Sequence, residues 1–177
     1  CRIQFRDPGF ETLVKAIVYQ QLSGRVASVI FGRLLAAAGG TPLAAEAVLR
    51  MRPQRMRALG LSKQKIAYIR DLARQTCDGA LDFAAMERLS DEEVIAALTA
   101  VKGIGVWTAH MFLIFALRRL NVLPVGDLGI RAAIRKAYNL PALPKPAEVM
   151  DLGRRWHPYC TVASWYLWRT LEPDANL

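Results

Sequence analysis

The sequence has few cysteines, and this shortage argues against whole classes of protein. Its 177 residues include only Cys1, Cys77 and Cys160, which are widely separated and form no CxxC pair. Such an odd, scattered set argues against a disulfide framework and against the usual zinc-site spacings. We therefore expect a reduced, cytoplasmic protein without a structural metal.

Long hydrophobic runs are also missing. The longest strongly apolar stretch, 106–117, has 12 residues, whereas a membrane-spanning helix needs about 20. The chain is nevertheless 53% apolar, enough to build a core and to exclude a disordered chain. Lys and Arg outnumber Asp and Glu by 24 to 15, a formal charge of +9, so an acidic partner is expected.

No segment alternates apolar and polar residues over a strand's length, so the pattern predicts an all-α protein. Ser90 and Glu93 form a capping-box pattern, and Gly39 and Gly40 end another helical pattern. The predicted helices cover about 10–18, 25–38, 43–50, 63–76, 91–100, 106–119 and 128–138, with a final helical region that includes 156–169.

Basic residues are concentrated between positions 50 and 74. This segment contains eight of them and a single acidic residue, a local charge of 8 − 1 = +7. They are Arg50, Arg52, Arg55, Arg57, Lys63, Lys65, Arg70 and Arg74, opposed by Asp71. A solvated charged surface and a footprint for a phosphate backbone both fit this pattern.

The segment Lys102-Gly103-Ile104-Gly105 separates two predicted helices. A turn of this kind leaves free amide groups at the start of the second helix, where the helix dipole favours an anion. Lys102 adds a positive charge beside the turn. An ordinary turn between helices would have the same sequence pattern.

Asp127 follows Gly105 by 22 residues and precedes the predicted helix 128–138. The simplest role for this residue is an N-cap. Capping amides also fix a carboxylate's direction, and an ionised carboxylate stabilises a sugar oxocarbenium ion, so the two roles are compatible.

Five ordered blocks resemble a known family. LTAVKGIGVWTA (98–109) and LPVGDLGIR (123–131) resemble the helix-hairpin-helix, Gly/Pro-rich, catalytic-Asp DNA glycosylases. FETLVKAIVYQQLS (10–23), GLSKQKIAYIRDLA (60–73) and WHPYCTVASWYLWR (156–169) are similar to the 3-methyladenine DNA glycosylase II type. The resemblance covers about 9–170 and implies an all-α fold with two helical lobes flanking a DNA-binding cleft.

The resemblance also implies an activity: flipping an alkylated purine, such as 3-methyladenine or 7-methylguanine, from double-stranded DNA and hydrolysing its glycosidic bond. We expect a monomer with one glycosylase domain over 1–177, no N-terminal β domain in this chain, no membrane association and, in a prokaryote, a place at the nucleoid. A non-catalytic DNA-binding module and a glycosylase for a deaminated or mismatched base are the alternatives.

Site residues follow from the resemblance, position by position. It implies Asp127 as the catalytic residue and Trp107, Met111 and Tyr159 as the base pocket. It places the DNA contacts at Gln21, Leu22, Ser23, Lys102, Gly103, Ile104, Gly105 and Thr108, with Gln21 filling the gap left by the flipped base.

Relatives that also cleave the DNA backbone carry a lysine nucleophile where this chain has Trp107, so the resemblance implies a monofunctional enzyme. Cys160 stands alone in the C-terminal region, so no iron–sulfur cluster is expected. No cofactor is required, although the hairpin carbonyls are candidates for a monovalent cation.

For several of these residues a purely structural role fits the sequence as well. Trp107, Tyr159 and Leu22 could belong to the core, with Gln21 as a polar residue at a helix end. His110 and His157 have no assigned role in the chemistry. Trp156, Trp165 and Trp168 are expected to pack the final helices.

Overall fold

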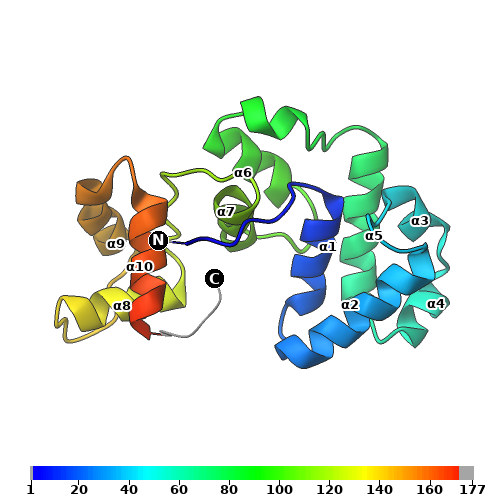
Figure 1. Cartoon of the computed structure of the whole chain (residues 1–177), viewed down its shortest axis with the longest axis horizontal. Coiled ribbons are helices and arrows are strands. Elements are labelled where there is room, and N and C mark those ends of the chain that lie inside the picture. Colours follow the sequence, from blue (N-terminus) through cyan, green and yellow to red (C-terminus); the bar gives the residue numbers. More distant parts are fainter. Residues whose placement is uncertain (1, 172–177) are drawn as a thin grey trace. The chain divides into compact units, whose positions relative to one another are not determined.

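The computed structural model describes residues 2–171 and is all-helical, with no strand among them (Figure 1). Cys1 lies outside the described residues. The α-helices are α1 Phe10–Tyr19, α2 Gly24–Ala38, α3 Ala45–Arg50, α4 Pro53–Ala58, α5 Lys63–Cys77, α6 Asp91–Thr99, α7 Val106–Phe115, α8 Leu128–Ala137, α9 Pro146–Gly153 and α10 Cys160–Leu171. Short 3₁₀ turns cover Ala85–Arg88 and Arg154–Trp156. Within the described part of the chain, no helix is both long and apolar enough to span a bilayer.

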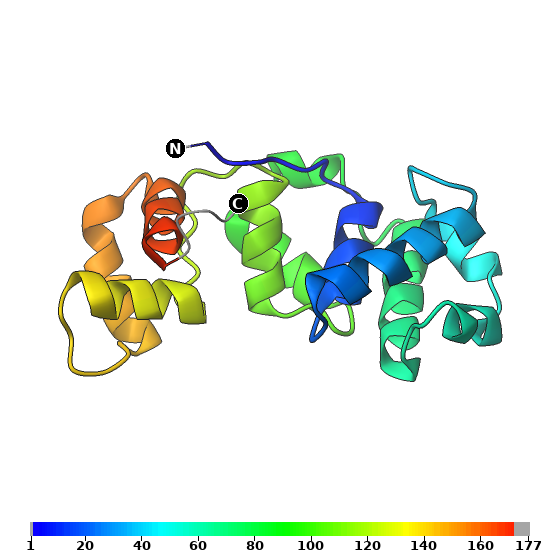
Figure 2. The same ribbon diagram turned by 60° about the horizontal axis from the view of Figure 1, so that its bottom comes forward.

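The chain divides into two compact units, which we describe separately. The hairpin unit is Asp7–Ala109, and the aspartate unit comprises Cys1–Arg6 and His110–Leu177. The division falls within α7, and the elements of both units can be followed by colour in Figure 2. The expectation of one domain over 1–177 stays a prediction.

In the hairpin unit, α1 packs against α2 and α5, and α3 packs against α5. The apolar stripe of α1, which recurs at helical spacing, is buried on one face (Phe10, Leu13, Val14, Ile17 and Val18). The two helix ends predicted from capping residues are confirmed. Ser90 and Glu93 form the complete capping box of α6, and α2 ends at Gly39 in the left-handed region, with φ +105°.

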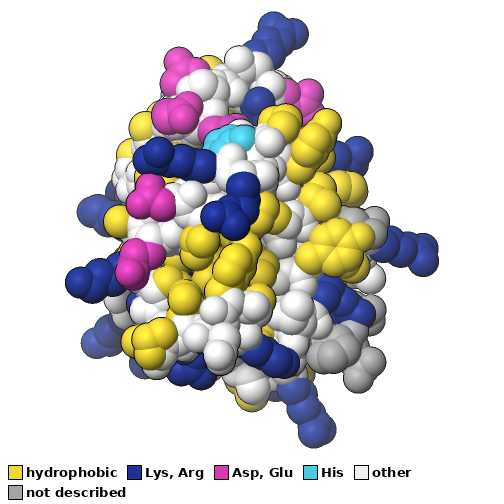
Figure 3. All heavy atoms as spheres, turned by 90° about the vertical axis from the view of Figure 1, so that its left-hand side faces the viewer, with side chains coloured by type: hydrophobic (Ala, Val, Ile, Leu, Met, Phe, Trp, Pro, Cys, Tyr) yellow, Lys and Arg dark blue, Asp and Glu magenta, His cyan; other side chains and the backbone are white. Residues whose placement is uncertain are grey.

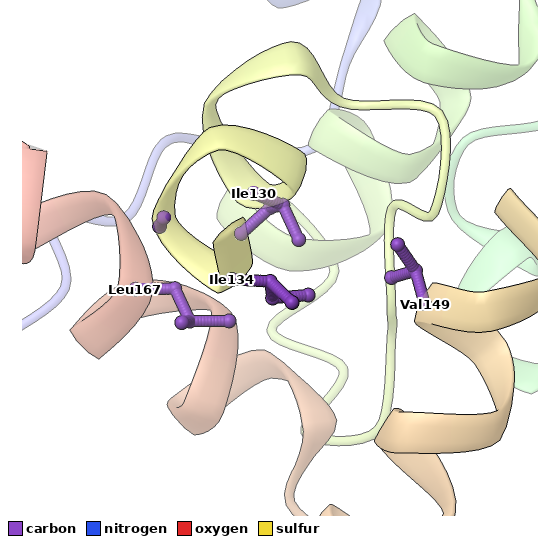
Figure 4. Packing of buried hydrophobic residues seen from close by; sticks show 5 residues of the cluster. Ile130, Ile134, Val149 and Leu167 are labelled. Atoms are coloured by element: carbon purple, nitrogen blue, oxygen red, sulfur yellow. The ribbon is translucent and has the colours of Figure 1, made fainter. Parts of the chain in front are cut away.

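In the aspartate unit, α8 packs against α10 around a small apolar cluster (Figure 4). The cluster consists of Ile130, Ala133, Ile134, Val149 and Leu167, from α8, α9 and α10. Figure 3 shows the end of the molecule that carries these helices, where hydrophobic and basic side chains are interspersed. The cluster supports the N-terminal end of α8, where Asp127 lies.

Two helix predictions need correction. The helix predicted over 106–119 ends at Phe115, and Arg118 has φ +58°, which an α-helix cannot accommodate. The predicted final helical region, which includes 156–169, consists of the 3₁₀ turn Arg154–Trp156 and α10, which begins at Cys160. The short helix α4, which begins with Pro53 in its first turn, was not predicted.

Candidate nucleic-acid interface and active site

The hairpin turn between α6 and α7 depends on Gly103. Its φ is +85°, and a Cβ at this position would lie 2.1 Å from Cδ2 of Tyr68 on α5. Glycine is therefore required by both backbone conformation and space. Gly105 differs, because its φ lies outside the left-handed region and a Cβ there would meet nothing within 4 Å.

The rest of the turn presents backbone and one cation to solvent. Lys102 is exposed, and its backbone N–H donates to Oδ2 of Asp71 (3.0 Å). Gly105 is also exposed, directly before the first turn of α7. Ile104 and Thr108 are buried. Of the hairpin residues expected to contact DNA, Lys102 and Gly105 are thus the exposed ones.

The turn between α1 and α2, residues 20–23, is the segment expected to fill a gap in DNA; we call it the plug turn. Gln21 is exposed and has φ +56°, a left-handed conformation uncommon for a residue other than glycine. The Leu22 side chain is 38% exposed, which excludes a core role. Ser23 is exposed and caps α2, since its Oγ accepts from the N–H of Val26 (3.5 Å).

Two side chains hold the plug turn in place. Nζ of Lys65 donates to the carbonyls of Val18 (2.6 Å) and Gln20 (2.7 Å). The Gln20 amide in turn donates to the carbonyl of Gly103 (2.9 Å), so the plug turn and the hairpin are directly linked. Burial lowers the pKa of the Lys65 ammonium. No local sequence pattern predicts this link, because it joins residues 45 to 83 positions apart.

In the aspartate unit, Asp127 is the N-cap of α8, as predicted, and is only 8% exposed. Its Oδ1 accepts from the backbone N–H of Ile130 (2.8 Å) and from the indole N–H of Trp168 (2.9 Å). Both groups are donors only, so Oδ1 accepts both bonds. The carboxyl group is thus fixed in direction.

Trp168 was predicted only to pack, and its hydrogen bond to Asp127 is a correction. The indole stacks on Phe115, with ring centroids 6.1 Å apart, and a Cβ at residue 129 would lie 3.2 Å from its Cδ1. That same Cβ would lie 3.1 Å from Oδ1 of Asp127. Gly129 therefore gives the indole and the carboxylate room to meet.

The three residues expected to form the base pocket are not core residues of either unit. Trp107 is 52% exposed in the hairpin unit, and Tyr159 is 58% exposed in the aspartate unit. Met111, one turn after Trp107 on α7, is half-buried. The alternative in which Trp107 and Tyr159 are core aromatics is therefore excluded.

The two histidines differ in their surroundings. His157 is exposed, and its Nδ1 lies 3.0 Å from the side-chain amide nitrogen of Asn121. His110 is half-buried in α7.

The fold and the pairing of a glycine hairpin with a capped aspartate define a class of DNA repair proteins, and comparison with known proteins agrees. Residues 14–158 match the model of the HhH-GPD superfamily of base excision DNA repair proteins. The chain is 39% identical over 166 residues to DNA-3-methyladenine glycosylase 1 of Schizosaccharomyces pombe, covering 91% of this chain and 72% of that protein.

Two solved structures are similar over almost the whole chain. A DNA-3-methyladenine glycosidase from Bacillus halodurans has a TM-score of 0.91 at 38% identity, covering 99% of this chain and 82% of that one. The S. pombe 3-methyladenine DNA glycosylase in complex with abasic DNA has a TM-score of 0.81 at 36% identity, covering 99% and 85%. This chain belongs to the HhH-GPD superfamily.

Proposed function

We propose that the chain is a monofunctional DNA glycosylase of base excision repair. It binds double-stranded DNA, flips out an alkylated purine such as 3-methyladenine or 7-methylguanine, and hydrolyses the N-glycosidic bond to leave an abasic site. Membership of the superfamily and the similarity to 3-methyladenine DNA glycosylases support this proposal. The observation that carries it is the buried Asp127 carboxylate, held by two N–H donors.

Binding begins at the hairpin, whose exposed backbone beside Lys102 suits a phosphate. Such a contact positions the protein on any sequence, because phosphates carry no base information. The plug turn, with Gln21 in its left-handed conformation and Leu22 exposed, then fills the space that the flipped nucleotide leaves. Unstacking that nucleotide costs a few kcal/mol.

Trp107 of the hairpin unit and Tyr159 and Met111 of the aspartate unit are the side chains that we assign to contact with the flipped base. An alkylated purine such as 7-methylguanine is positively charged, and an electron-rich ring binds a cation more tightly than a neutral base. Its charge also weakens the glycosidic bond, so that the base leaves as a neutral molecule with the bonding electron pair. No general acid is then needed for this substrate.

Asp127 stabilises the sugar cation that develops as the base departs. Its negative charge is prealigned by Ile130 and Trp168, so little reorganisation is required at the moment of bond cleavage. Water adds to the anomeric carbon and loses a proton, which completes the hydrolysis. Asp127 is the residue placed to orient this water or accept its proton.

The test is base release from duplex DNA that contains 7-methylguanine, with abasic sites revealed by alkali. The wild-type chain should release the base, and Asp127→Asn should be at least about 100-fold slower, the scale of losing one preorganised electrostatic contact. Asn keeps the side-chain shape, so DNA affinity should stay similar or rise. Unchanged turnover would refute the assigned role, whereas binding without release in the wild type would favour a DNA-binding module or another lesion.

A second test concerns the monofunctional chemistry. An amine nucleophile would form a Schiff base with the sugar, which borohydride reduces to a stable covalent adduct. Residue 107 is tryptophan and has no such amine, so no adduct should form at this position. A trapped enzyme–DNA adduct that maps to residue 107 or its neighbours would contradict the proposal.

A further inference from the structure

The basic segment 50–74 separates into two groups in the structure. Lys65, Arg70 and Arg74 have partners within the hairpin unit, through the carbonyl contacts of Lys65 and Arg70 and the Asp71 ion pair of Arg74. The other five, Arg50, Arg52, Arg55, Arg57 and Lys63, have no side-chain hydrogen bond or ion pair among the described residues.

Three residues of this second group, Arg50, Arg52 and Arg55, line one hollow of about 490 Å³ between the end of α2 and the corner that joins α3 to α4. The rest of its lining is Ala37, Ala38, Ala47 and Met51, with no carboxylate among the lining residues. We call it the arginine hollow. Three like charges around one space repel one another unless an anion lies between them.

The backbone that lines the arginine hollow is held in place by Arg70. Nη1 of Arg70, on α5, donates to the carbonyls of Val48, Leu49 and Met51, at 3.4, 3.2 and 3.0 Å. The corner between α3 and α4 is therefore tied to the core helix of the hairpin unit, which preorganises a site for binding.

The position of the arginine hollow sets a distance from the plug turn. Helix α2 starts directly after Ser23 and runs 15 residues to Ala38, which lines the hollow. At 1.5 Å per residue this helix separates the two sites by about 21 Å. A stretch of duplex of the same length contains about six base pairs, at roughly 3.4 Å each.

We propose that the arginine hollow binds phosphates of the DNA duplex about six base pairs from the lesion, as a second anchor apart from the hairpin. This inference rests on the proposed function. Guanidinium forks match phosphate oxygens in geometry and charge. A lining of three arginines and small side chains is typical of a protein–DNA interface, whereas protein partners favour a more apolar centre.

The experiment compares duplexes of 9 and 25 base pairs, each with a central tetrahydrofuran abasic-site analogue, in binding to Arg50→Gln/Arg52→Gln/Arg55→Gln. The short duplex ends before the arginine hollow, so its affinity should equal that of wild type within about twofold. The long duplex should bind about 10-fold more weakly than to wild type. Its slope of log affinity against log salt should also fall by about 2 to 3, roughly one per phosphate contact.

The matched control is Arg2→Gln/Arg88→Gln/Arg135→Gln, which removes the same charge from exposed residues that have no ion-pair partner in the described chain. It should affect both duplex lengths alike. If the triple variant unfolds, shown by its far-UV spectrum, Arg52→Gln alone replaces it, with an expected loss of about threefold on the long duplex only.

Three results would overturn the inference. They are an unchanged long-duplex affinity, a loss equal on both lengths, and a loss of polyglutamate binding with DNA binding intact, which would assign the arginine hollow to an acidic protein. Failure of the wild-type chain to bind either duplex would instead refute the proposed function, so the two failures are distinguishable.

Discussion

A charged side chain with two hydrogen-bonded neighbours lies at the candidate site of each unit, but the two side chains have opposite charges and different proposed roles. In the hairpin unit, the Lys65 ammonium donates to two carbonyls and so fixes the plug turn, which is the proposed DNA contact. In the aspartate unit, the Asp127 carboxylate accepts from two N–H groups and is itself the proposed catalytic group.

This difference predicts where each unit contributes. Changes around Lys65, Gly103 and the plug turn should alter stability and DNA binding, because they move a surface that contacts the duplex. Changes around Asp127 should alter the chemical step on DNA that is already bound. The predictions below test this division, starting with the largest expected effect.

The first prediction compares the two hairpin glycines. Gly103→Ala should lower the unfolding free energy by about 3 kcal/mol or more, because it combines left-handed strain with overlap against Tyr68. Gly105→Ala should leave stability nearly unchanged, since its Cβ meets nothing within 4 Å. Urea unfolding of both variants measures the difference.

DNA binding sharpens the same comparison. Replacing Gly105 with the bulkier valine should weaken affinity for all DNA sequences alike, because it obstructs a phosphate contact and no base contact. A loss restricted to some sequences would contradict the phosphate-anchor role of the hairpin. Equal destabilisation by the two alanine substitutions would contradict the account of Gly103.

The second prediction concerns the indole bond to Asp127. Trp168→Phe removes the N–H but keeps a ring to stack on Phe115, so the fold should persist. A hydrogen bond to a charged group contributes about 1.5–3 kcal/mol, so the single-turnover rate of base release should fall about 10- to 100-fold. Affinity for abasic DNA should change less than twofold.

A matched control lies on the same helix. Trp165 also belongs to α10, and its buried indole N–H has no hydrogen-bond partner among the described residues. Trp165→Phe should therefore leave the rate of base release unchanged. If both variants lose activity equally, the effect of Trp168 is packing alone and its positioning role is wrong.

A feature could be predicted from the sequence where its interacting residues lie close together along the chain. The capping box at Ser90 and the cap at Asp127 involve partners three residues away, so short patterns predict them. The indole that completes the aspartate site comes from 41 residues along the chain, and only the fold brings it there. Helix α4, with the sequence PQRMRA, buries only Met56 and so shows no apolar stripe.

The solvent exposure of the candidate site residues could not be predicted from the sequence either. An apolar or aromatic residue such as Leu22, Trp107 or Tyr159 fits both a core and a ligand contact, because composition does not report which face of an element is covered. The structure decides between them by exposing all three. Their roles on DNA remain part of the proposed function.

The last and smallest effect is expected at Lys65. Lys65→Met keeps most of the side-chain stem but removes both hydrogen bonds to the carbonyls of Val18 and Gln20. The expected loss of unfolding free energy is about 1 kcal/mol, because water can replace part of the interaction at this half-buried site. Lys63→Met, at the exposed first position of α5, is the stability control and should change little.

Lys65→Met also tests whether the hydrogen bonds from Lys65 to the plug turn contribute to DNA binding. A loosened plug turn should weaken binding to abasic DNA by about fivefold, while the single-turnover rate at saturating enzyme stays near that of wild type. This pattern is the reverse of the one expected for Trp168→Phe. A lower rate without weaker binding would show that the two units do not divide the work as their contacts imply, because a change in the hairpin unit would then act on the chemistry of Asp127.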